Sequence, residues 1–478
     1  MEAQRRSHAR PLISSLLRSR LVLLVAFAFA VMGDPVSSVA YAIEAAVRAL
    51  HGDLALLVAT MAIVLAMIAL VSLNYHHLYA RFPEGGGDAA ATGTAFGEGW
   101  AFLPLGSLIV DYTLTITISV AAGSSAIIAF LPGLAPLRIP LALLLLVAVA
   151  GLTWFGHGGR VVFATMTLGF LAVGAVVIAK GLLAPAAHGS SPLVPAGHRD
   201  TAPFAVLLAF PVAMALATGV EAPSSAIAQL GQLDDPGRRR FGRITLWLML
   251  GIVVTLTLGL SVLAVRLRIG IPPADSTEIA EVAKTAVGEG ALFAAFQVTT
   301  AILLLAAASS SFQAGPGLLK ALSQIGGRVG VLPGSLGQTN RHHTPYWGVV
   351  VFLVVSAVIV AAAGAREQRL VLFYAVAVFA AFLCGLLAMA KFFRAEGRRL
   401  LLIASIIGAL GVSLTLAVNV ARGYPIVSLI AALAIAATLH ALWVRAGRPR
   451  GVAEAERLAE VAVDAEGAGR ADLSPQAR

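Results

Sequence analysis

Three acidic residues lie inside long apolar runs of the sequence, where an ionised carboxylate is costly. They are Asp34, Asp111 and Glu221. A carboxylate at bilayer depth is tolerated when it is protonated, paired or bound to a cation. No Lys or Arg lies near the middle of any of these runs, so we expect the balancing positive charge to come from solution. The pattern therefore predicts a site for a proton or for a small cation.

Hydroxyl side chains occur at helical spacing from each acid. The pairs on one face are Asp34 with Tyr41, Asp111 with Thr115, and Thr218 with Glu221. Carboxylate and hydroxyl oxygens are the ligands that hard cations prefer. The acids could instead cap exposed backbone amides, and a tyrosine such as Tyr41 or Tyr374 could be a packing residue with its hydroxyl bonded to a carbonyl.

Two of the apolar runs are interrupted in the same way. The residues of the first interruption are Gly33, Asp34, Pro35, Ser37 and Ser38, and those of the second are Gly219, Glu221, Pro223, Ser224 and Ser225. The proline lacks a backbone N–H donor, and the glycine makes the backbone flexible. Both leave backbone groups without hydrogen bonds, and hydrocarbon offers such groups no partner. Broken helices of this kind line protein-enclosed polar cavities in transporters.

The two interruptions lie five apolar runs apart. In both, a serine pair follows the acid at the third and fourth positions. A repeat of five segments enters the membrane in the opposite orientation, so the pattern predicts a five-plus-five inverted repeat. The predicted core is 21–393, made of repeat 1 (21–183) and repeat 2 (203–393). Helices 11 and 12 (400–445) follow it.

The composition indicates an integral membrane protein. Of the 478 residues, 59% are hydrophobic and 12% are charged, and the mean hydropathy is +0.89. One cysteine, Cys384, excludes a disulfide framework and a multi-cysteine metal site, and we expect no cofactor. The net charge of +10 comes from basic residues spread over short loops, which indicates membrane topology and not nucleic-acid binding.

Twelve apolar runs are long enough to cross a bilayer. They are 21–50, 54–73, 100–130, 138–156, 161–183, 203–228, 244–266, 290–315, 346–364, 369–393, 400–420 and 425–445. Lys and Arg are roughly twice as frequent in the loops on the side of the N-terminus. We therefore predict an all-α protein of the plasma (inner) membrane with a leader (1–20) and a short tail (446–478), both cytoplasmic.

Three segments outside these runs have a recognisable character. Leu78–Gly99 is glycine-rich and predicts a turn into an interfacial segment. Ala274–Val287 reads as a short amphipathic helix on the outer face, either a lid or a cover for helix ends. Gly451–Arg478 has few large apolar residues and predicts a frayed helix or a disordered tail.

These features together resemble the amino acid-polyamine-organocation (APC) superfamily of transporters, over nearly all of 20–445. Within it, the closer resemblance is to potassium-proton symporters of the KUP and KimA types. The motifs that carry it are Asp34 with Tyr41 seven residues later, Asp111-Tyr112-Thr113-Leu114-Thr115, Thr218-Gly219-Val220-Glu221-Ala222, Tyr374-Ala375-Val376, and Arg81-Phe82-Pro83 in a loop. Pro35 departs from the KimA type, and the large C-terminal domain of that type has no counterpart here.

The resemblance implies a LeuT-like fold with helices 1 and 6 broken, and proton-coupled uptake of potassium by alternating access. It implies that the ion lies near Tyr41, Asp111, Thr115, Thr218 and Tyr374. It also implies that Asp34 and Glu221 both interact with the coupling proton and with the cation. The expected partners are a small solute, a coupling proton and the lipid bilayer, with no nucleic acid; whether the chain forms a homodimer is left open.

Two other functions are compatible with parts of this pattern. An amino acid or polyamine permease has the commoner activity of the superfamily, but a substrate carboxylate would be repelled by Asp34 and Glu221 unless these are protonated. A membrane-embedded aspartyl protease would use Asp34 and Asp111, but Val31 stands where its Gly-x-Gly-Asp motif requires a glycine. We therefore expect a transporter and not an enzyme.

Overall fold

The computed structural model describes residues 20–155, 160–183, 202–324 and 330–467. Within these ranges the chain is helical and the structure contains no β-sheet. The predicted leader, apart from Arg20, and the last residues of the predicted tail lie outside the described ranges.

Ten helical segments of the described residues are long and apolar enough to cross a membrane. Nine of them are built on α5 (Leu57–Arg81), α7 (Phe102–Phe130), α8 (Arg138–Trp154), α9 (Arg160–Leu183), α12 (Asp235–Leu267), α14 (Ala291–Ser323), α16 (Glu367–Ala395), α17 (Arg399–Ala421) and α18 (Ile426–Arg445). The tenth is Ala202–Gln229. Two shorter apolar helices, Leu21–Val31 and Tyr346–Ala362, fall in the two remaining apolar runs.

The first predicted segment is kinked and not unwound. It consists of α2 (Arg20–Val31), α3 (Gly33–Ser37) and α4 (Val39–Ala49). The single residues between them, Met32 and Ser38, both keep right-handed helical dihedrals. Pro35 lacks a backbone donor but has a φ that a helix accepts, so the chain bends here without leaving the helical path.

The sixth predicted segment does unwind in its middle. It contains α10 (Ala202–Ala213), η3 (Met214–Ala217), α11 (Ala222–Ala226) and η4 (Ile227–Gln229). Between η3 and α11, Thr218 is extended (φ −64°, ψ 140°) and Gly219 has a φ of +81°. Pro223 lies in the first turn of α11, where no intrahelical donor is lost.

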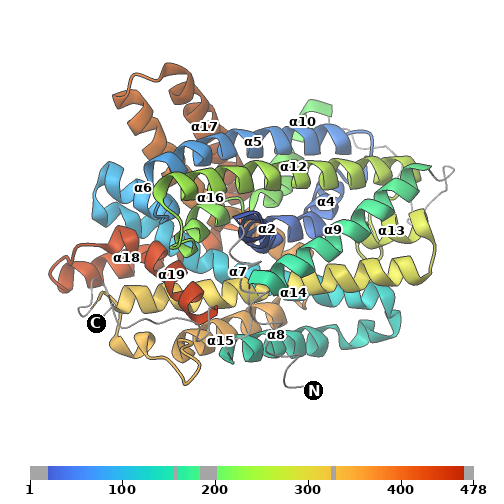
Figure 1. Ribbon diagram of the computed structural model, residues 1–478. Helices are drawn as coiled ribbons and strands as arrows, with labels where there is room; N and C mark the ends of the chain where they lie inside the picture. The colour runs from blue at the N-terminus through green and yellow to red at the C-terminus, as the bar shows by residue number, and fades with distance from the viewer. Residues whose placement is uncertain (1–19, 156–159, 184–201, 325–329, 468–478) are drawn as a thin grey trace.

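Many of the long helices run roughly along one direction, with α5 beside α12 on one side of the bundle and α8 beside α15 (Tyr346–Ala362) on the other, whereas α2 is seen nearly end-on (Figure 1). α14 and α16 both pack against α7 in the interior. The outer helices expose apolar side chains, with Leu144 of α8 and Leu410 of α17 each 65% exposed. An apolar exterior over this length matches the hydrocarbon of a bilayer.

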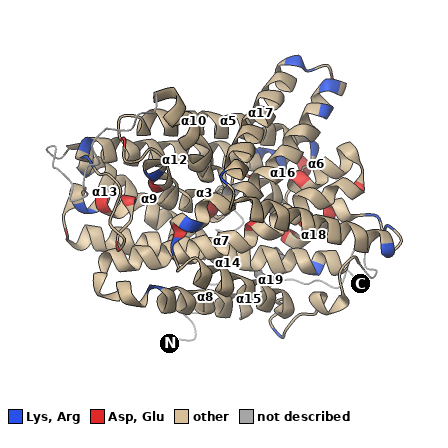
Figure 2. Ribbon diagram, turned by 180° about the vertical axis from the view of Figure 1, so that it is seen from behind, with Lys and Arg blue, Asp and Glu red and all other residues tan. Residues whose placement is uncertain are grey.

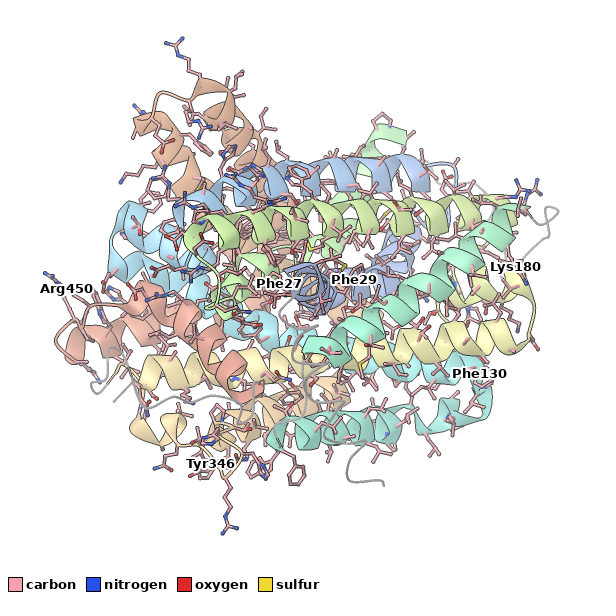
Figure 3. All side chains as sticks on the ribbon, in the orientation of Figure 1. Phe27, Phe29, Phe130, Lys180, Tyr346 and Arg450 are labelled. Atoms are coloured by element: carbon pink, nitrogen blue, oxygen red, sulfur yellow. The ribbon has the colours of Figure 1, made fainter. Side chains whose placement is uncertain are left out.

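Different short elements cover the two ends of the bundle (Figure 1). One end carries α13 (Glu278–Val287), whose N-cap Thr277 accepts a hydrogen bond from the amide of Ala280 (3.3 Å). This bears out the short helix expected within 274–287. Lys180 and Phe130 mark this end, and Arg450 marks the opposite one (Figure 3). Lys and Arg residues, blue in Figure 2, lie mainly toward the ends of the helices.

The opposite end carries three short elements that pack together. They are α6 (Gly87–Phe96), η7 (Val452–Glu454) and α19 (Ala455–Gly467). The sequence predicted a frayed or disordered tail from Gly451 onward, and this is wrong for the described part. Val452 and Ala455 are fully buried and Ala459 is 4% exposed, because small side chains let α19 approach its neighbours closely.

Candidate functional site

The two interrupted segments touch each other at their interruptions. A Cβ atom at Gly219 would lie 2.8 Å from Pro35 Cδ and 3.1 Å from Asp34 Cγ, so only glycine fits there. Ser38 adds a polar contact, because its hydroxyl donates to the carbonyl oxygens of Pro35 (2.7 Å) and Leu216 (3.1 Å). The bend of the first segment is therefore fastened to the sixth where the sixth unwinds.

The other residues of the predicted interruptions have local roles. Ser37 donates to the carbonyl of Asp34, and Ser224 to that of Glu221, each at 2.7 Å and each three residues back in the chain. Both carbonyls also accept a backbone amide, from Ser38 (3.3 Å) and Ser224 (2.7 Å), so the hydroxyls add a second, local bond within the same turn. A Cβ at Gly33 would lie 3.1 Å from Thr167 Oγ1 of α9, so Gly33 allows close packing.

Four of the predicted hydroxyls meet at this junction, and each comes from a different segment. Tyr41 of α4 lies with its hydroxyl 3.5 Å from Thr218 Oγ1. Thr115 of α7 donates to the hydroxyl of Tyr374 of α16 (2.8 Å). The rings of Tyr41 and Tyr374 join the two pairs, edge to face, with centroids 6.3 Å apart. All four side chains are buried.

The two remaining predicted acids line a small cavity beside these hydroxyls. Asp111 Oδ1 and Glu221 Oε2 are buried and have no hydrogen-bond partner among the described residues. The cavity has a volume of about 10 Å³, close to the least that holds one water molecule. Buried carboxyl oxygens without donors require a proton or a cation, which is the requirement that the sequence indicated.

The cavity contains two further acids that the sequence reasoning missed. Asp88 of α6 and Glu456 of α19 line it together with Asp111 and Glu221. Tyr75 of α5 donates to Asp88 (2.9 Å). Burial raises the pKa of Asp88 to about 8 against the opposing effect of this hydrogen bond. Two sequence features could have indicated these acids. They are the glycine run before Asp88, and the four-residue spacing of Glu456 and Glu460, which places both on one face of a helix.

The site offers hydroxyl, carboxyl and carbonyl oxygens as ligands. Among the described residues, no group of three or more His, Cys, Asp or Glu side chains is arranged to hold a metal ion. Alkali cations are bound in proteins by carbonyl and hydroxyl oxygens as well as by carboxylates. Asp34, which is partly buried, lies against Gly219 and does not line the small cavity.

Comparison with known proteins gives two findings. A family model described as amino acid permease matches residues 23–453. The potassium transporter KimA of Bacillus subtilis (strain 168) is 28% identical over 368 residues, which are 73% of this chain. The chain spans 58% of the length of that relative.

Proposed function

Because the chain belongs to the amino acid permease family, and is thus an integral membrane protein of the transporter class, we propose that it takes up potassium together with a proton by alternating access. The observation that carries the proposal is the pair of buried carboxyl oxygens, on Asp111 and Glu221, that have no hydrogen-bond partner in the described part of the chain, together with four buried hydroxyls. The similarity to a potassium transporter supports the choice of ion.

The proposed architecture is a LeuT-like five-plus-five inverted repeat with twelve transmembrane helices. Two features support it: the interruptions lie five apolar segments apart, and they contact each other through Gly219 and Pro35. In such a fold, the substrate site lies where the two broken helices meet. Repeat 1 then covers 21–183 and repeat 2 covers 203–393, with 400–445 appended.

Within this site, the hydroxyls of Tyr41, Thr115, Thr218 and Tyr374, with the carboxyl of Asp111, hold the potassium ion. Asp34 and Glu221 exchange the coupling proton. The hydroxyl distances of 2.8 and 3.5 Å support the first assignment, because they bring these oxygens from four segments to one place. The position of Glu221 beside Asp111 supports the second, because two carboxylates in one cavity favour a proton on one of them.

The proposed orientation places the α19 end of the bundle in the cytoplasm and the α13 end outside the cell, in the plasma (inner) membrane. The excess of Lys and Arg in the loops at the α19 end supports it. Arg81, Lys391 and Arg398 all belong to that end.

A second candidate is the proton-coupled uptake of an amino acid or polyamine, which the description of the family model favours. Asp34 and Glu221 would repel the carboxylate of a neutral amino acid. A cationic amine avoids this repulsion and would bind to the same acids.

The experiment that tests the proposal is uptake by cells that lack their own potassium importers, supplied with potassium at micromolar concentration. We expect the chain to restore growth and the variant Asp111→Asn to abolish it, because the amide cannot balance a cation. Asp275→Asn, at an exposed carboxyl of the α13 end, is the matched control and should behave as the parent. Uptake of a radiolabelled amine or amino acid without growth rescue would favour the second candidate.

A further inference from the structure

The C-terminal helix α19 is seated in the end of the bundle and not beside it. It packs against α14, α6, α11 and η4. Its two buried carboxyls are held by neutral donors: Ser225 donates to Glu456, and Gln229 Nε2 donates to Glu460 (2.7 Å). Between them, Ala459 faces Gly317 of α14. The helix is thus bound to both the sixth segment and α14.

We call the surface that α19 contacts on α14, α6, α11 and η4 its seat. The seat lies between the candidate ion site and the α19 end of the bundle. Glu456 lines the same small cavity as Asp111 and Glu221. Next to Glu456 is an apolar cluster that contains Val452, Ala455 and Ala459 together with Phe102 of α7 and Leu318 of α14. A solute that leaves the site toward this end therefore meets the side chain and then the body of α19.

We propose that α19 is an autoinhibitory helix that closes the cytoplasmic end of the transport pathway, and that solute passes only when the helix leaves its seat. The inference rests on the proposed function for the transport activity and for the orientation. It adds a regulatory role to a segment outside the ten-helix core.

Two features of the seat favour reversible dissociation of α19. The buried residues that α19 itself contributes to the apolar cluster are two alanines, Ala455 and Ala459, with Leu458 packed against it. An alanine buries little apolar surface, so the hydrophobic contribution of these two residues is small. The connection to α18 contains three residues with positive φ: Gly447 (82°), Arg448 (56°) and Gly451 (101°). These residues turn the chain sharply and give α19 a hinge.

A disulfide that locks the seat tests the proposal on the full-length chain. A Cβ at Gly317 would lie 3.7 Å from the Cβ of Ala459, within the range of about 3.5–4.5 Å that disulfides require. The variant combines Gly317→Cys and Ala459→Cys in a Cys384→Ser background, which removes the single native cysteine. The single-cysteine variants serve as matched controls.

We expect oxidation to reduce uptake by the double variant to background, and a reducing agent to restore it. The single-cysteine controls should transport equally before and after oxidation. Full uptake by protein whose cross-link has been verified by thiol counting would overturn the proposal, because transport would then proceed with α19 seated.

A second measurement does not depend on which solute is carried, and so separates this inference from the proposed function. Ser107→Cys, in the Cys384→Ser background, places a thiol in the cavity wall, and its labelling by a small water-soluble reagent reports access. Ala459→Arg should unseat α19 and raise the labelling rate about tenfold or more, because an arginine cannot be buried against Gly317. Val461→Arg, at a position of the same helix that is 47% exposed, is the control.

Equal labelling in the Ala459→Arg and Val461→Arg proteins would overturn the role of α19, whether or not the chain carries potassium. Faster labelling with no potassium uptake by the parent would instead reject only the proposed solute.

Discussion

The two ends of the bundle are closed by different chemistry. At the α13 end, Arg48 pairs with Glu44 (2.8 Å), and the other oxygen of Glu44 accepts the backbone amide of Glu278 (3.1 Å). This amide begins α13, so a charged pair from the first segment fastens the short helix that covers the end.

A second cation reinforces the same end. Arg138 of α8 donates to the hydroxyl of Ser125 (2.6 Å) and to the carbonyl of Ala274 (2.7 Å), just before α13. Ser125 in turn donates to Glu367 of α16 (2.7 Å). Arginine keeps its charge at any physiological pH, so the cation of each of these contacts is permanent.

At the α19 end, neutral donors take the place of these arginines. Tyr75 donates to Asp88, Ser225 to Glu456 and Gln229 to Glu460. Glu456 Oε2 has no hydrogen-bond partner among the described residues. Burial raises the pKa of Glu456 and raises that of Glu460 to about 7. A carboxyl held in this way is stable when protonated, so we infer that this end responds to pH.

One acid at the α13 end has no arginine partner in the described part of the chain. Glu278 is fully buried at the α13 end, and neither of its carboxyl oxygens has a partner among the described residues. Burial raises its pKa well above the usual range. The α13 end therefore also contains an acid whose burial favours the protonated form, but Arg48 holds Glu44 there, and Arg138 holds Glu367 through Ser125.

The largest effect is expected at the α13 end from Arg138→Leu. The substitution leaves Ser125 and Glu367 without their cation and frees the carbonyl of Ala274. Breaking a buried charged network from one side costs about 3–5 kcal/mol. The measurement is the free energy of unfolding of the purified protein in a denaturing detergent. Arg240→Leu, at an exposed arginine, is the control, and an equal loss in the two variants would contradict the structural role of Arg138.

An intermediate effect is expected at the α19 end from pH alone. Seated Glu460 has a pKa of about 7 and the free carboxyl an ordinary value of 4.5, so the seated form binds more protons. Seating is therefore strongest below the ordinary value and weakens as the pH rises through about 7. Between about pH 6 and pH 8, the seating equilibrium should fall about tenfold for this group alone.

The neighbouring acids favour the same sign, because Asp88 of α6 and Glu221 before α11 line the cavity that Glu456 lines, and like charges raise a carboxyl pKa. The other groups near the two carboxyls are Tyr75 of α5, Tyr112 of α7 and, at the rim, Arg457, which is paired with Glu454 and Glu84. Amide hydrogen exchange of α19, corrected for its intrinsic pH dependence, measures the seating. The double variant Glu456→Gln with Glu460→Gln cannot titrate and should lose the dependence. A parent protein with the same protection at both pH values would refute the difference between the ends.

The candidate ion site was more predictable from the sequence than the seating of α19 at the end of the bundle. Helical spacing correctly placed Asp111 and Thr115 on one face of α7, and buried acids without cations indicated their chemistry. The shared helical face predicted for Thr218 and Glu221 is wrong, because Thr218 is extended and Gly219 has a positive φ between them. The convergence of Tyr41 and Tyr374 followed from the resemblance to a family and not from spacing. Their roles in transport stay predictions.

Two features could not be predicted from local sequence. The first interruption was expected to break the helix as the sixth does, but a proline such as Pro35 fits helical dihedrals, whereas Gly219 adopts a positive φ that leaves the helix. The seating of α19 depends on Gly317 and Gly87, which are far away in the chain and make room for Ala459 and Glu456. Complementarity between small residues in distant segments leaves no pattern in either segment alone.

The smallest effect is expected at the rim of the α19 seat. Arg457 pairs with Glu84 (2.5 Å), but the two side chains are 28% and 57% exposed. Exposed ion pairs contribute about 0.2–1 kcal/mol. The variant Glu84→Gln should therefore change the labelling rate of Ser107→Cys by less than about fivefold, and the change should vanish at about 1 M salt, where charges are screened within about 3 Å. A loss of protection as large as that of Ala459→Arg would mean that exposed charges, and not buried neutral carboxyls, hold this end closed.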